Sequence, residues 1–288
     1  MKPELIADYN CQVGEGPLWH PDEKRLYWVD IPNGRLFRYD PATGQHETCY
    51  EGRPIGGFTV QADGALLLFM DKGTVMLWHD GKVKTVVEEI PAERETRFND
   101  VIADPAGRVF CGTMPTEDRP GRLYRLDVDG ALTEVVGGVG VSNGLGFTPD
   151  RKGMYYTDTT KHVIYLFDYD EVTGTITHQR DFVRVPRVEG EGHPDGMTVD
   201  AEGYVWGARW DGSCLVRYAP DGTEVQRVTF PAKKVSCPTF GGEDYTDIYV
   251  TTANIQGKEV EGPGAGALFR VNLGIKGVPE FRSKIGLK

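Results

Sequence analysis

A unit of about 40 to 50 residues recurs six times along this chain, and a period of this length is typical of propellers and solenoids. Each copy has an apolar run, a turn, a strand rich in aromatic or β-branched residues, a loop of small residues and a further strand that ends in a charged turn; the first reads GEGPLWHPDEKRLYWVDIPNGRLFRYDPATG. Aligning the copies on the first turn places these residues in register: Asp22, Asp63, Ala106, Asp150, Glu202 and Glu243. The repeat therefore indicates an architecture of six equivalent units.

Four short strands per unit, recurring with a fixed internal phase, fit a propeller blade better than a sandwich. We therefore predict an all-β fold, a six-bladed β-propeller that forms a single domain over residues 1–288. The stretch PELIADY, residues 3–9, precedes the first copy and has strand character. We expect it to supply the outer strand of the last blade, which would close the ring and cover its edges.

The composition agrees with such a fold and limits the possible partners. The 37 Gly and 18 Pro imply many turns and few long helices. A net charge of -11 disfavours nucleic acid and anionic membrane surfaces, because binding to either uses clustered Lys and Arg. The sequence contains no run approaching the roughly 20 apolar residues of a membrane span and no signal-peptide pattern. We expect a cytoplasmic protein, a monomer or weak homo-oligomer, that acts on a small molecule.

A polar residue or glycine stands seven positions before the aligned turn in every copy. These residues are Glu15, Gly56, Asn99, Asn143, Asp195 and Ser236. The innermost strands of a propeller run along its central channel, so one phase of the repeat points at one level of the axis. We therefore predict that Glu15, Asn143 and Asp195 meet at a channel mouth and bind one divalent metal ion. Ca²⁺ is expected first, with Mg²⁺, Mn²⁺, Zn²⁺ and Fe²⁺ as alternatives.

Simpler interpretations exist for some of these motifs. Asn-Gly and Asp-Gly are common hairpin turns, but the phase that they share with Glu15 favours a site. GVSNG, residues 140–144, matches the G-x-S-x-G nucleophile pattern, yet the following LGFTPDRKG predicts a strand and a turn where that motif needs a helix. His193, two residues before Asp195, is either a base or supporting group of the site or a simple loop histidine.

Several motifs, taken in order, resemble the gluconolactonase and senescence-marker protein (regucalcin) family. They are VGEGPLW, RFND, the GTM of CGTMP, SNGLGF, PDGMTVD and FGGEDY, and they span nearly the whole chain. The resemblance implies a six-bladed propeller that hydrolyses sugar lactones with one divalent metal ion at the channel mouth. Carried over by motif, the metal ligands fall on Glu15, Asn143 and Asp195, and the substrate contacts fall on Arg97, Asn99 and Glu117.

The resemblance and the predicted site together point to a metal-dependent lactone hydrolase that uses a metal-activated water. Asp195 is predicted as the general base, with the metal-activated water acting alone as the alternative, because a carboxylate held against a dication is less basic. A related propeller esterase or phosphotriesterase and a non-catalytic calcium-binding propeller remain as other possible functions. The loops at residues 115–121, 186–193 and 254–266 are expected to rim the pocket.

Overall fold

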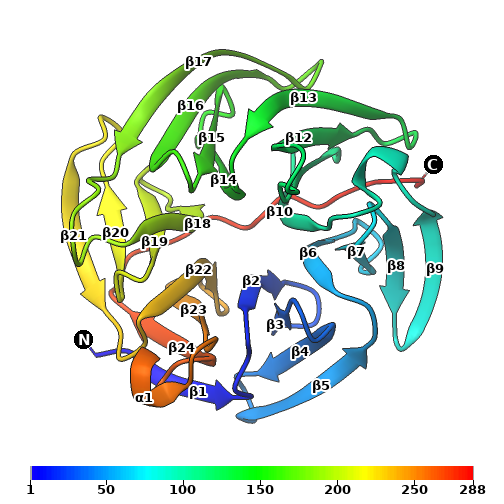
Figure 1. Ribbon diagram of the computed structural model, residues 1–288. Helices are drawn as coiled ribbons and strands as arrows, with labels where there is room; N and C mark the ends of the chain where they lie inside the picture. Colours follow the sequence, from blue (N-terminus) through cyan, green and yellow to red (C-terminus); the bar gives the residue numbers. More distant parts are fainter. Residues whose placement is uncertain (1, 288) are drawn as a thin grey trace.

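Six four-stranded antiparallel sheets stand as blades around a central channel (Figure 1). The structure is a computed structural model and describes residues 2–287. Its helical elements within that range are the 3-10 turn η1 (Pro91–Glu93) and the one-turn helix α1 (Lys258–Glu261). No helix in the described range is long and apolar enough to cross a membrane. The predicted all-β class and the six-bladed propeller are confirmed.

In blades 1 to 5 the strands follow one another in chain order from the channel outward. Blade 1 comprises β2 (Gly14–His20), β3 (Arg25–Asp30), β4 (Arg35–Asp40) and β5 (Gln45–Glu51). Blade 2 comprises β6 (Ile55–Val60), β7 (Leu66–Met70), β8 (Val75–His79) and β9 (Lys82–Val87). Blade 3 comprises β10 (Phe98–Ala103), β11 (Val109–Thr113), β12 (Gly121–Leu126) and β13 (Leu132–Val139). Blade 4 comprises β14 (Ser142–Phe147), β15 (Gly153–Asp158), β16 (Val163–Asp170) and β17 (Thr175–Arg184). Blade 5 comprises β18 (His193–Val199), β19 (Val205–Trp210), β20 (Cys214–Tyr218) and β21 (Glu224–Thr229).

Blade 6 combines strands from both ends of the sequence. From the channel outward it comprises β22 (Lys234–Gly241), β23 (Asp247–Ala253), β24 (Ala267–Asn272) and β1 (Glu4–Asp8). β1 runs antiparallel to β24, with Glu4 opposite Arg270, and the Arg270 guanidinium donates to the Glu4 carboxylate at 2.7 Å. The prediction that PELIADY completes the last blade is therefore confirmed, and the pairing covers the outer edge of β24.

Apolar side chains fill the six interfaces between neighbouring blades, with one cluster at each. Between blades 3 and 4, for example, Phe110 packs with Phe147, Met154 and Tyr156. Burying one large apolar side chain contributes about 1.5 to 3 kcal/mol, so each interface is a substantial source of stability. These interfaces hold the six innermost strands in a fixed ring around the channel.

Every innermost strand has a β-bulge at the same level of the channel. The pairing with the second strand shifts between Glu15 and Leu18, Ile55 and Gly57, Phe98 and Val101, Asn143 and Leu145, Pro194 and Met197, and Val235 and Cys237. A bulge removes a residue from the regular ladder and redirects nearby side chains. This level contains the polar position that recurs in the six sequence repeats.

The segment that follows β24 crosses the end of the channel opposite to the bulges (Figure 1). Ser283 N–H donates to Val60 O at 3.0 Å, and Ala62 N–H donates to Ser283 O at 2.8 Å, which ties the segment to blade 2. Ala201 N–H donates to Lys276 O at 2.8 Å and ties it to blade 5. This segment, residues 273–287, is called the C-terminal strap, and it spans one end of the channel; the opposite, bulged end is called the mouth.

Candidate functional site

The three predicted metal ligands lie at the mouth of the channel. Glu15 is on β2, Asn143 on β14 and Asp195 on β18, and their side chains are only 3%, 5% and 5% exposed. They are also electrostatic neighbours: burial raises the pKa of both carboxyls, the charge of Asp195 raises that of Glu15 further, and the Asn143 amide partly opposes the rise at Asp195. Three blades thus bring these polar groups to one place.

Glycines allow the strands to approach so closely. A Cβ atom on Gly144 would lie 2.6 Å from Asp195 O, and one on Gly196 would lie 2.5 Å from Cys237 Sγ. Both contacts are too short for any side chain. Of the glycines that follow the three predicted ligands, Gly16 has a positive φ of 53°, whereas Gly144 and Gly196 are required by close packing of the backbones.

A chain of hydrogen bonds links blades 3, 4 and 5 at the site. Arg97 Nη1 donates to Asn99 Oδ1 at 2.7 Å, and Asn99 Nδ2 donates to Asn143 Oδ1 at 2.6 Å. Asn143 Nδ2 donates to Thr159 Oγ1 at 2.8 Å, and Thr159 Oγ1 donates to Pro194 O at 2.8 Å. The guanidinium donates only, so it determines the orientation of both amides. One lone pair of Asn143 Oδ1 remains for a ligand.

Three carboxyl groups share the mouth with one guanidinium. Burial raises the pKa of Glu15 and of Asp195 well above the usual range, and the charge of Asp100 raises both further. Burial also raises the pKa of Asp100 to about 7. Arg97 opposes these shifts at Asp195 and Asp100, although burial lowers its own pKa. If all three carboxyls ionise, Arg97 balances only one of them, so the mouth favours an added cation.

The donor atoms fit a divalent cation of the oxygen-binding kind. Glu15 and Asp195 supply carboxylates and Asn143 supplies an amide oxygen, a set that suits Ca²⁺. In the described part of the chain the Glu15 carboxylate accepts one hydrogen bond, from Gly16 N–H at 3.1 Å, and neither carboxylate forms an ion pair. No group of three or more His, Cys, Asp or Glu side chains within residues 2–287 is arranged to hold a metal ion, and the candidate set has two carboxylates and one amide oxygen.

The predicted substrate contacts differ in how well they are placed. Arg97 is half-buried at the mouth, and its hydrogen bonds use Nη1 alone, which donates to Phe98 O and to Asn99. Asn99 is buried and both of its side-chain polar atoms form hydrogen bonds, because Oδ1 accepts from Arg97 and Nδ2 donates to Ser142 O at 2.7 Å as well as to Asn143. Glu117 is exposed on the loop between β11 and β12, at the same end of the molecule. The geometry thus favours Arg97 as a substrate contact and Asn99 as a support for Asn143.

Sequence reasoning missed Asp100 and Thr159. Asp100 stands in the apolar strand FNDVIA, the same signal that drew attention to Asp195, but it is one residue outside the register position. The β-bulge between Phe98 and Val101 accounts for its position beside the channel. Thr159 follows β15 in a turn, where a threonine is unremarkable; only the structure shows its two hydrogen bonds.

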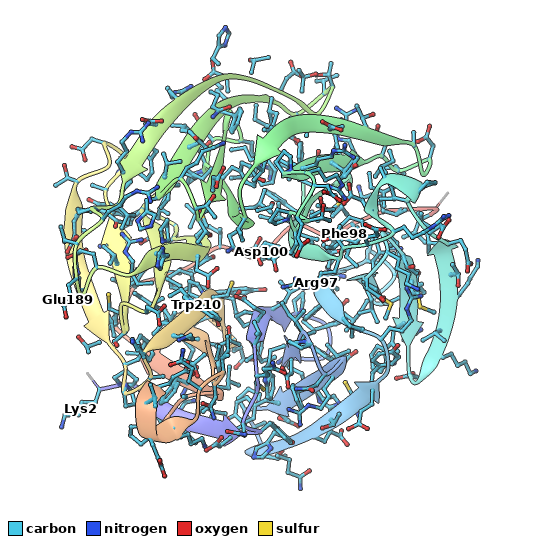
Figure 2. All side chains as sticks on the ribbon, in the orientation of Figure 1. Lys2, Arg97, Phe98, Asp100, Glu189 and Trp210 are labelled. Carbon is cyan, nitrogen blue, oxygen red and sulfur yellow. The ribbon has the colours of Figure 1, made fainter. Side chains whose placement is uncertain are left out.

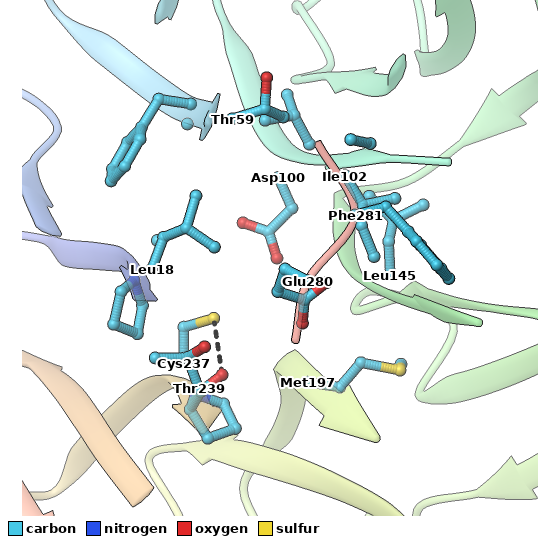
Figure 3. Close-up of a pocket in the computed structure, with 17 residues that line it drawn as sticks. Leu18, Thr59, Asp100, Ile102, Leu145, Met197, Cys237, Thr239, Glu280 and Phe281 are labelled. Carbon is cyan, nitrogen blue, oxygen red and sulfur yellow. Dashed lines mark hydrogen bonds between the residues drawn. The ribbon is translucent and has the colours of Figure 1, made fainter. Parts of the chain in front are cut away.

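Below the mouth, the channel narrows to a cavity of about 70 Å³ that the C-terminal strap closes (Figure 3). Asp100 points into it from β10, and Glu280 reaches it from the strap. Burial raises the pKa of Glu280 to about 7. The Thr198 hydroxyl, at 3.4 Å, is its hydrogen-bond partner in the described chain. The lower channel is therefore bounded by the strap and holds two buried carboxyls whose pKa values are raised.

His193 pairs with a second histidine. Its Nδ1 lies 2.8 Å from Nε2 of His162, which is on the turn between β15 and β16. One of the two nitrogens must donate and the other accept, so the pair shares a single proton between the rings. One ring nitrogen of His193 is thus used in the hydrogen bond with His162, so His193 is not simply a solvated loop residue.

Fold and site together define a six-bladed propeller with a carboxylate and amide centre at one channel mouth. The sequence profile of the SMP-30/Gluconolactonase/LRE-like region matches residues 13–254, and the chain belongs to this family. Pentonolactonase XacC of Haloferax volcanii is 51% identical, with 98% of both chains covered. Chicken (Gallus gallus) regucalcin is 33% identical, again with 98% of both chains covered.

The structural comparison agrees with the sequence comparison. A calcium-binding protein, regucalcin, from Agrobacterium tumefaciens superposes with a TM-score of 0.89 at 25% identity, covering 98% of this chain and 97% of that one. The resemblance to the gluconolactonase and senescence-marker protein family that the motifs indicated is confirmed.

Proposed function

We propose that this protein is a divalent-metal-dependent hydrolase that opens sugar lactones. The observation that supports the proposal is that Glu15, Asn143 and Asp195, from three blades, are buried at the same end of the channel and that Glu15 and Asp195 influence each other's charge. Membership of a family that includes a 51% identical pentonolactonase supports the reaction class. A calcium-binding relative of the same fold supports Ca²⁺ as the first metal to test.

The three ligands would hold the cation, which when bound polarises the lactone carbonyl and makes water more acidic. Asp195 accepts a proton from the attacking water, whose oxygen forms a bond to the carbonyl carbon. The ring C–O bond then breaks, and the ring oxygen receives the proton from Asp195. The product is an open-chain hydroxy acid, which leaves Asp195 ready for the next substrate.

The polar side chains at the mouth favour a hydroxylated substrate. Arg97 has N–H groups that donate to no acceptor within residues 2–287, and they can donate to substrate oxygens. Covering such groups with an alkyl chain leaves each buried donor unsatisfied, at a cost of about 1 to 3 kcal/mol. Aldonolactones are therefore better substrates for this site than alkyl lactones, aryl esters or phosphotriesters.

The proposal is tested on protein stripped of metal with a chelator and then supplied with single cations. Hydrolysis of an aldonolactone, an alkyl lactone, an aryl ester and a phosphotriester is measured for each cation, and the number of bound ions is measured by calorimetry. We expect one strong site and the highest kcat/KM for the aldonolactone. Activity that survives complete metal removal contradicts metal dependence. A bound cation without any hydrolysis assigns the protein to the non-catalytic calcium-binding class.

A further inference from the structure

A second pocket opens beside the channel mouth, above blade 5. Its volume is about 600 Å³, and it lies where loops of blades 4, 5 and 6 meet. The lining residues that matter here are His162, Arg187, Glu189, His193, Asp211 and Lys233. Figure 2 shows Glu189 at the outer rim of the ring and Trp210, the neighbour of Asp211, closer to the axis. The pocket thus extends from the rim toward the mouth.

The pocket adjoins the candidate active site through β18. His193 lines the pocket and stands two residues before Asp195 on that strand. Two residues of extended chain span about 7 Å, which is comparable to the length of a sugar ring. A substituent on a substrate whose lactone group lies at Asp195 can therefore extend into the pocket.

The side chains that line the pocket leave positive charge free. Lys233 is exposed and its ammonium group forms no ion pair within the described chain, and Arg187 uses its guanidinium only to donate to Thr160 O at 2.6 Å. Of the two acids, Asp211 accepts from Lys234 at 2.8 Å, although the same ammonium also pairs with Glu261 at 2.7 Å. Within residues 2–287, Lys233 and Arg187 therefore keep N–H groups that no carboxylate accepts, and these groups are what the pocket offers to an anion.

Nearby positive charges also affect the pKa of His162, which belongs to the histidine pair at the inner wall of the pocket. Burial is the main cause that lowers the pKa of His162, and the charges of His193, Arg187 and Arg209 lower it further. Arg209 is 1% exposed, and its Nε and Nη1 have no hydrogen-bond partner within residues 2–287. Nδ1 of His162 is likewise buried without a partner. The wall behind the pocket therefore contains a buried cation that no carboxylate neutralises directly.

We propose that this pocket binds an anionic group, a carboxylate or a phosphate, that the substrate carries away from its lactone carbonyl. The inference rests on the proposed function and names its substrate class: acidic or phosphorylated sugar lactones. Lys233 and Arg187 donate to the anion, and His193 is placed to donate through Nε2 while its Nδ1 stays with His162. Charge-assisted hydrogen bonds of this kind are about twice as strong as neutral ones.

The test compares one neutral aldonolactone with its carboxylate and phosphate derivatives on the metal-loaded protein. We expect kcat/KM to be at least about tenfold higher for one or both anionic substrates than for the neutral one, the scale of one charge-assisted hydrogen bond. Lys233→Ala and Arg187→Ala should each reduce the anionic-to-neutral ratio by about tenfold. Lys82→Ala, an exposed lysine on the outer strand β9, is the matched control and should leave the ratio unchanged.

Binding is measured separately from turnover by titrating the protein with inorganic phosphate and with acetate. Phosphate binding that weakens in Lys233→Ala but not in Lys82→Ala supports the pocket, and the better of the two anions identifies the group it takes. A parent ratio near one, or no loss of phosphate binding in Lys233→Ala, overturns the inference. If no lactone of any kind is hydrolysed, the proposed function fails, and the titration still decides whether the pocket binds anions.

Discussion

Asn99 Nδ2 donates to Asn143 Oδ1 at 2.6 Å across the boundary between blades 3 and 4. The two residues occupy the same position of the sequence repeat, so the sixfold architecture itself brings them together. Arg97 determines the orientation of the Asn99 amide, and Asn99 in turn determines the orientation of the Asn143 amide. The Arg97 guanidinium therefore aligns Asn143 Oδ1, the oxygen that we propose as a metal ligand. Disturbing any member should change the site without changing the fold.

Asp195→Asn tests the proposed general base. The variant keeps the shape of the side chain and an oxygen ligand but cannot accept a proton from water. We expect turnover of an aldonolactone to fall by at least about a hundredfold, the usual contribution of general-base catalysis. Calorimetry must show that the metal still binds. Activity within a few-fold of the parent, with metal bound, would mean that the activated water reacts without Asp195.

Thr159 is predicted to be a positioning residue for Asn143. Thr159→Val removes the hydroxyl that joins Asn143 Nδ2 to Pro194 O, and we expect kcat/KM to fall by about tenfold, as for one lost hydrogen bond. Thr159→Ser keeps the hydroxyl and should restore most of the activity. Thermal unfolding of both variants is the control. Loss in Ser but not in Val would show that the methyl group, and so packing, is responsible, and equal loss in both would contradict a role for the hydroxyl alone.

Arg97→Ala tests the substrate contact. We expect kcat/KM for a sugar lactone to fall by about tenfold or more, and that for a simple alkyl lactone much less, because only the sugar offers hydroxyls to the guanidinium. Arg97 also lowers the pKa of Asp195, so its loss should move the acidic limb of the pH–rate profile to higher pH. Equal losses with both substrates would identify Arg97 as a support for Asn99 alone.

Glu280→Gln tests the buried carboxyl of the C-terminal strap. Its pKa of about 7 lies above the value of 4.5 for an exposed glutamate. Between these values the folded protein keeps a proton that the unfolded chain has lost, so the free energy of unfolding falls as pH rises. That loss amounts to at most about 3 kcal/mol, and the variant should not show it. Urea unfolding of both proteins at pH 5 and pH 8 measures the difference; parallel changes would contradict the prediction.

The repeat made much of this structure predictable. The number of copies predicted six blades, and the strand character of residues 3–9 ahead of the first copy predicted the closing strand. The phase of the repeat placed Glu15, Asn143 and Asp195 at one level of the channel, and their role as metal ligands stays a prediction. Asp100 was not predictable from phase, because the β-bulge breaks the two-residue alternation on which phase arguments depend. Glu280 was not predictable either, since the strap follows the last repeat and has no equivalent in any other blade. A repeat pattern predicts features that all copies share, and it cannot predict a feature that occurs only once in the chain.

The pairing of β1 with β24 also sets the order in which the molecule can assemble. During synthesis β1 leaves the ribosome well before its partner β24, so the ring stays open until strands of all six blades exist. Joining such distant segments has a large loop-closure entropy and is intrinsically slow. Once formed, the same seam resists release of either strand, and a slow closing step of this kind favours a long-lived native ring.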